Sequence, residues 1–127
     1  MIMYATLGAH DLKVAVPFYD KLMPTIGYVR VSDGDWGVSY GPDKNVKKVY
    51  VMKPANGLPA TFGNGTMLTF EAPSRGAVDK FHATALANGG IDEGKPGIRG
   101  DASSNFYAAY VRDLTGNKLC AACTKPA

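Results

Sequence analysis

The sequence repeats one pattern twice, and this repeat constrains the fold more than any other feature. Shifted by 63 residues, Phe18 aligns with Phe81 and Gly27 with Gly90. Identities are few, but the apolar positions around both phenylalanines share the helical spacing i, i+1, i+4, i+5, i+8. These positions are Val14, Ala15, Phe18, Tyr19 and Leu22, aligned with Ala77, Val78, Phe81, His82 and Ala85. A repeat of this length indicates two copies of one supersecondary unit.

Each half of the chain is predicted to contain a strand, a helix and three more strands. In the first half we expect a helix over Asp11–Pro24 and strands over Ile2–Ala9, Tyr28–Ser32, Trp36–Tyr40 and Val46–Lys53. In the second half we expect a helix over Ser74–Asn88 and strands over Thr66–Ala72, Phe106–Arg112 and Lys118–Thr124, with Ile91–Ile98 a loop or short strand. The offset grows to 70 later in the chain, which indicates an insertion of seven residues within Ile91–Asn105. The predicted fold class is α+β, with two tandem βαβββ modules over residues 1–53 and 65–127 and a linker over 54–64.

Composition excludes several functional classes. The 127 residues are 46% hydrophobic, which suits one domain with one core. The net charge is only +3 and the basic residues are scattered, so we expect no nucleic-acid partner. No apolar run approaches the roughly 20 residues of a membrane span, and no signal peptide is visible. Cys120 and Cys123 fall on opposite faces of the last predicted strand, so they are expected to be free thiols in a cytoplasmic protein.

Three stretches resemble the glyoxalase/bleomycin resistance protein/dioxygenase superfamily, the vicinal oxygen chelate proteins. They are Thr6–Leu12 followed by Ala15–Asp20, then Gly63–Thr66 followed by Ala72–Arg75 and Phe81-His82, and finally Asn105–Asp113 followed by Gly116–Lys118. The resemblance covers nearly the whole chain. It implies one domain whose two modules form a curved, barrel-like mixed sheet around a cleft, and it implies a homodimer.

The resemblance also implies where a divalent metal would bind. In that superfamily, His and Glu ligands project from the first and last strands of each module. Those positions fall here on Tyr4, Tyr50, Met67 and Cys120. None is a histidine or a carboxylate, so we expect no metal cofactor, and a divalent metal is suggested by the resemblance alone. The remaining metal-binding candidates are His10, His82 and Glu71.

Without a metal, the same positions are predicted to line a pocket for a small molecule. The predicted wall consists of Tyr4, Trp36, Tyr50, Met67, Tyr107, Tyr110 and Cys120, with Tyr40 as a further candidate. Aromatic and thioether side chains suit such a pocket, although they equally suit a filled core. Cys120 is the one candidate nucleophile, and the sequence offers it no histidine partner.

Three functions follow, and the sequence leaves all three open. The first is a glyoxalase-like or bleomycin-resistance-like protein that binds a small molecule in its cleft without the usual metal. The second is a metal-dependent enzyme, lactoylglutathione lyase-like or dioxygenase-like, with non-standard ligands. The third is a non-catalytic, dimeric interaction protein whose core is filled. Fold alone does not decide among them.

Overall fold

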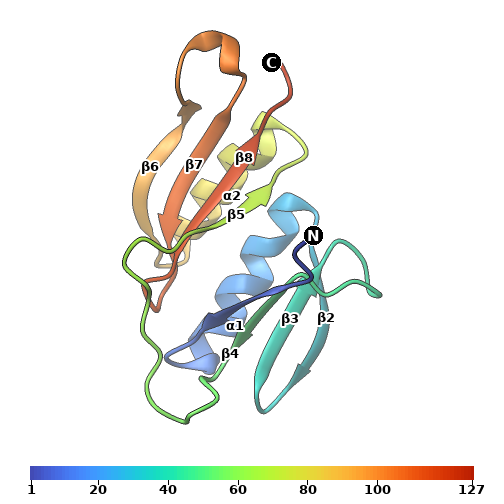
Figure 1. Ribbon diagram of the computed structural model, residues 1–127, viewed down its shortest axis with the longest axis vertical. Helices are drawn as coiled ribbons and strands as arrows, with labels where there is room; N and C mark the ends of the chain where they lie inside the picture. The colour runs from blue at the N-terminus through green and yellow to red at the C-terminus, as the bar shows by residue number, and fades with distance from the viewer.

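The computed structural model describes residues 1–127 and shows the same order of elements twice (Figure 1). Module one contains β1 (Ala5–Gly8), α1 (Leu12–Leu22), a 3₁₀ helix (Met23–Ile26), β2 (Val29–Gly34), β3 (Gly37–Gly41) and β4 (Val49–Met52). Module two contains β5 (Leu68–Glu71), α2 (Arg75–Ala87), β6 (Ile91–Ile98), a 3₁₀ turn (Ala102–Ser104), β7 (Tyr107–Arg112) and β8 (Lys118–Cys123). The predicted α+β fold of two tandem βαβββ modules is confirmed.

Each module forms its own four-stranded mixed sheet. The strand orders are β1-β4-β3-β2 and β5-β8-β7-β6, with the first strand of each module parallel to the last and all other pairs antiparallel. No strand pair joins the two sheets, so the expectation of one barrel-like sheet is wrong: the curved modules stay separate. As a result, β1 and β5 each keep one edge without a partner strand.

Both helices begin where a side chain caps their first free N–H groups. The Asp11 carboxylate accepts a hydrogen bond from the Lys13 backbone N–H (2.9 Å), and the Ser74 hydroxyl accepts one from Ala77 (3.1 Å). The first helix ends earlier than predicted, because Pro24 lacks an N–H and the chain tightens into the 3₁₀ turn. Neither helix has the length and apolar character needed to cross a membrane.

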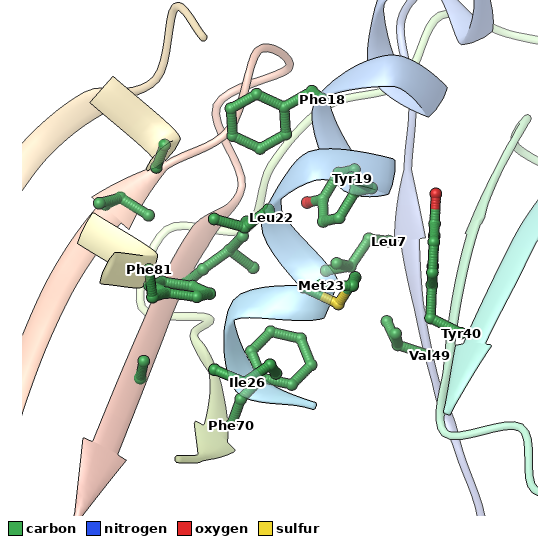
Figure 2. Close-up of a cluster of buried hydrophobic side chains, with 14 of the residues drawn as sticks. Leu7, Phe18, Tyr19, Leu22, Met23, Ile26, Tyr40, Val49, Phe70 and Phe81 are labelled. Carbon is green, nitrogen blue, oxygen red and sulfur yellow. The ribbon is translucent and has the colours of Figure 1, made fainter. Parts of the chain in front are cut away.

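One hydrophobic core of 22 buried residues joins the two modules, with α1 lying at its centre (Figure 2). Met23 of the 3₁₀ helix points toward the sheet of module one. The Tyr19 ring of α1 lies 6.2 Å from that of Tyr40, between centroids, and its hydroxyl is directed to module two. Leu22 at the end of α1 and Ile26 of the 3₁₀ helix point the other way, toward Phe81 and module two. The sheet of module one packs on α1, the sheet of module two packs on α2, and the two helices pack on each other, so the modules do not have separate cores.

The opposite face of each sheet is free of helices, and we call it the open face. Strand alternation assigns its residues. The open face of module one carries Tyr4, Thr6, Ser39, Tyr50 and Met52, and that of module two carries Met67, Thr69, Glu71, Ala108, Tyr110 and Cys120. Because the inner faces share one core, the open faces turn away from it. No hydrogen bond or ring contact joins a side chain of one open face to a side chain of the other.

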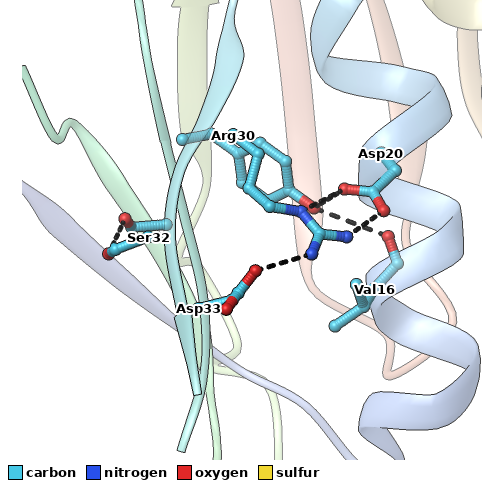
Figure 3. Close-up of polar contacts among 7 residues, drawn as sticks. Val16, Asp20, Arg30, Ser32 and Asp33 are labelled. Carbon is cyan, nitrogen blue, oxygen red and sulfur yellow. Dashed lines mark hydrogen bonds and ion pairs between the residues drawn. The ribbon is translucent and has the colours of Figure 1, made fainter. Parts of the chain in front are cut away.

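A polar cluster fixes β2 and β3 against α1 (Figure 3). Arg30 pairs with Asp20 of α1 and with Asp33 (2.9 Å). The Tyr40 hydroxyl donates to Asp20 Oδ1 (2.7 Å), and burial together with this carboxylate raises the pKa of Tyr40. Tyr40 therefore faces the helix, which corrects its prediction as part of the cleft wall.

A second polar cluster connects the two modules around the β7–β8 turn. Asp113 is buried and accepts a hydrogen bond from the Tyr19 hydroxyl of α1. The Asn117 side-chain amide donates to the same carboxylate and to the carbonyl of Gly8 in β1, both at 2.9 Å. The His10 backbone N–H donates to Thr115 Oγ1 (3.0 Å). The turn of module two is thus bonded to the helix and first strand of module one.

Candidate functional site

The open face of module one carries an aromatic cluster. The rings of Tyr4 and Tyr50 lie 4.9 Å apart between centroids, and those of Trp36 and Tyr50 lie 5.7 Å apart. Tyr4 is 50% exposed, so the cluster forms a surface and does not fill a closed core. Beside it is a hollow of about 670 Å³, lined by Met1, Met3, Tyr4, Asn45, Val46, Lys47, Lys48 and Tyr50.

The open face of module two has a row of residues that crosses all four strands. Thr69 lies opposite Cys120, Cys120 opposite Tyr110, and Tyr110 opposite Gly94. Cys120 is fully buried within this row and packs with Ala108, Ala122, Phe106 and Tyr110. Met67, 42% exposed, lies two residues before Thr69 on the same face.

The predicted wall residues thus divide into two groups within one chain. Tyr4, Trp36 and Tyr50 meet on module one, whereas Tyr110 and Cys120 meet on module two, with Met67 near them. Tyr107 belongs to neither group: its hydroxyl donates to Asp79 of α2 (2.5 Å), so it lies on the inner face of β7.

No family model matches the sequence, and no curated protein matches it. Among solved structures, a glyoxalase/bleomycin resistance protein from Albidiferax ferrireducens T118 is 38% identical, with a TM-score of 0.87 and 99% of each chain covered. The chain belongs to the glyoxalase/bleomycin resistance protein family.

More distant members and neighbours share the fold. A glyoxalase/bleomycin resistance protein/dioxygenase family enzyme from Burkholderia phytofirmans PsJN is 16% identical, with a TM-score of 0.70 over 97% of this chain and 98% of that one. A fosfomycin resistance protein from Listeria monocytogenes is 13% identical, with a TM-score of 0.68 over 97% and 92%. At these identities the likeness shows the architecture only.

The residues of this family member do not fit the divalent metal that the superfamily implies. Nowhere do three His, Cys, Asp or Glu side chains gather as a metal site requires. His82 lies between α2 and β6 and contacts Asp92 (2.9 Å), without a third partner. His10 is in the exposed turn after β1, and Glu71 is exposed on β5 and forms no ion pair. These three candidates come from separate parts of the fold.

Cys120 is poorly suited to act as a nucleophile. Burial raises the pKa of its thiol, although a hydrogen bond with Thr69 and the positive charges of Arg99 and Lys118 oppose that rise. The thiolate is the reactive form, so a buried thiol with a raised pKa is protonated and unreactive at neutral pH.

We therefore expect slow alkylation of Cys120 by iodoacetamide. Its rate at pH 7 should be far below that of free cysteine, and should rise about tenfold per pH unit up to pH 9, following the thiolate fraction. Tandem mass spectrometry of the peptide that holds both thiols separates Cys120 from Cys123. Alkylation at pH 7 as fast as that of free cysteine would contradict the structure and restore the nucleophile hypothesis.

The sequence missed one functional group on the open face of module two, the guanidinium of Arg99. The Arg99 Cζ atom lies 5.2 Å from the centroid of the Tyr110 ring, and Lys118 Nζ lies 5.6 Å from the same centroid. Arg99 falls within Ile91–Asn105, the stretch predicted to contain the seven-residue insertion, where the internal repeat gives no certain counterpart for comparison. The glycines of β6, Gly94 and Gly97, were the available signal, since glycine in a strand often marks a close approach of another group.

Proposed function

We propose that this family member binds a small organic molecule in a cleft, without the divalent metal of its superfamily. The observation that carries the proposal is the chemistry at the four expected ligand positions, which hold Tyr4, Tyr50, Met67 and Cys120. Tyr4, Tyr50 and Met67 remain partly exposed, and aromatic and thioether side chains of this kind suit an apolar ligand. No cofactor is part of the proposal, and two free thiols favour a reducing, cytoplasmic compartment.

We propose further that the cleft is completed by a second copy of the chain. In such a homodimer, the open face of module one in one copy covers the open face of module two in its partner. Two features support this arrangement: the free edges of β1 and β5, and the exposed apolar side chains next to them, Met3 (76%), Tyr4 and Met67. Free strand edges beside apolar side chains favour association.

Sedimentation velocity tests the dimer, with Met67→Lys as the variant. We expect wild-type protein to sediment with twice the mass of one chain, and the lysine to weaken the dimer at least about tenfold, because a charge is desolvated in the interface. The matched control is Leu86→Lys on α2, where an apolar residue of similar exposure (39%) lies away from both open faces. A monomeric wild-type protein, or equal weakening by both variants, would overturn the dimer.

Fluorescence titration with the neutral probe N-phenyl-naphthylamine tests the pocket. We expect saturable binding that Tyr50→Ala weakens about tenfold, since Tyr50 contacts both Tyr4 and Trp36. Leu86→Lys should leave binding unchanged. If the wild-type protein does not bind the probe, the proposed pocket is wrong.

Elemental analysis and titration with zinc, nickel, manganese and iron(II) test whether a metal binds. A metal that is bound stoichiometrically and stabilises the protein would overturn the metal-free hypothesis.

A further inference from the structure

The open face of module two carries two cationic side chains that form no ion pair. They are Arg99 and Lys118, which both lie against the ring of Tyr110. Arg112, the cross-strand neighbour of Lys118, is different because it pairs with Glu93. Two cations against one ring, neither paired with a carboxylate, create a local positive potential on this face.

Arg99, which directly follows β6, is held in place by the backbone of that strand. Its Nη1 donates to the carbonyl of Gly97 (3.0 Å) and its Nη2 to that of Lys95 (2.5 Å). A guanidinium has five N–H donors, so further donors remain without a protein partner. The group is therefore oriented by β6 and still able to bind an acceptor.

The glycines of β6 provide the space for this arrangement. A side-chain Cβ at Gly94 would lie 2.7 Å from Tyr110 Cδ2 and 3.3 Å from Arg99 Nη2. A Cβ at Gly97 would lie 3.2 Å from Arg99 Nη1. Residues with side chains at these two positions would displace both the ring and the guanidinium.

The side chains that continue the cross-strand row from Tyr110 are neutral. Cys120 and Thr69 continue the row from Tyr110, and the thiol is buried and protonated. Glu71 lies in the next row, opposite Ala122, and forms no ion pair with either cation. The positive charge of Arg99 and Lys118 is thus not neutralised on this face.

We propose that Arg99 and Lys118 form an anion subsite and that the ligand is an organic anion with an apolar body. The anionic group, such as a carboxylate or sulfonate, binds Arg99 and Lys118 beside Tyr110. The apolar body packs against the Tyr4, Trp36 and Tyr50 cluster of the partner copy. This inference rests on the proposed cleft and adds the charge of its ligand.

Two fluorescent probes of similar shape test the charge. Anilinonaphthalene sulfonate is an anion, and N-phenyl-naphthylamine is its neutral counterpart. In Arg99→Met and Lys118→Met, we expect the anionic probe to bind about tenfold more weakly and the neutral probe to bind as in wild type. Arg99→Lys keeps the charge and should retain most of the binding. Lys80→Met removes an exposed charge from α2, where Lys80 forms no ion pair, and should change neither probe.

The outcomes separate the two proposals. If both probes bind wild type and neither Arg99→Met nor Lys118→Met discriminates between them, the pocket stands and the anion subsite is wrong. If Lys80→Met weakens the anionic probe as much as Arg99→Met, net charge explains the effect and the subsite is also wrong. If neither probe binds wild type, the proposed pocket itself fails. Circular dichroism melting of each variant confirms that a loss of binding is not a loss of fold.

Discussion

Replacing Asp113 with alanine is expected to lower the free energy of unfolding by about 3 to 5 kcal/mol. Asp113 is only 5% exposed. Its Oδ1 accepts the backbone N–H groups of Thr115 (3.0 Å), Gly116 (2.9 Å) and Asn117 (2.8 Å), and its Oδ2 accepts the Tyr19 hydroxyl and the Asn117 amide. Alanine removes this acceptor from all of these donors. The Gly116 N–H and the Asn117 amide keep bonds to backbone carbonyls, but the Tyr19 hydroxyl and the Thr115 and Asn117 N–H groups lose their partner, and each unsatisfied buried donor carries a desolvation cost.

Tyr19→Phe is the matched partner for this prediction, because it removes one donor and leaves the turn intact. We expect a cost of about 1.5 to 3 kcal/mol, the range for a hydrogen bond to a charged group. Since both substitutions delete the Tyr19–Asp113 bond, the double variant should cost less than the sum of the two. Equilibrium unfolding in urea measures all three. An Asp113→Ala protein within about 1 kcal/mol of wild type would show that the turn does not hold the modules together.

The Asp113 turn also shows how far local sequence patterns reach. Asp113 and Asn117 belong to the last of the three stretches that resemble the superfamily. The spacing of apolar residues correctly predicted the helices and the order of strands. These signals are local, because each depends on residues within one element. The packing of module against module depends on contacts such as Tyr19 with Asp113, separated by 94 residues, and no periodicity encodes such a pair. For this reason the two modules were predicted correctly, whereas their separation into two curved sheets was not.

The candidate site shows the same limit. Tyr107 and Tyr110 are three residues apart in one strand, so alternation alone places them on opposite faces, and that signal was available from the sequence. Which of the two faces the helix depends on packing, which the sequence did not show. Tyr40 and Trp36 are four apart and should share a face in a regular strand. They do not, because the chain between them is not regular at Gly37.

Gly37→Ala is therefore expected to be among the most damaging substitutions in module one. Gly37 has φ +143°, in the region that favours glycine. A Cβ there would lie 2.1 Å from the carbonyl oxygen of Val51 and 2.7 Å from Cα of Met52. Both atoms are backbone of the paired strand β4, so relief requires the strands to separate. We expect a cost of at least about 3 kcal/mol in the free energy of unfolding.

Gly57→Ala in the linker is the matched control, because it introduces backbone strain without a steric clash. Gly57 also has a positive φ, +73°, but nothing lies within 4 Å of its missing Cβ, so only backbone strain of about 1 kcal/mol is expected. Trp36, the only tryptophan, precedes Gly37 and contacts Tyr50, so its fluorescence reports directly on the aromatic cluster. Gly37→Ala should shift that emission to longer wavelength as the ring becomes solvated, whereas Gly57→Ala should not. If both variants have equal stability and unchanged emission, β3 does not approach β4 as closely as described. The register of the two strands would then differ, and the residues of the aromatic wall of the proposed pocket would have to be reassigned.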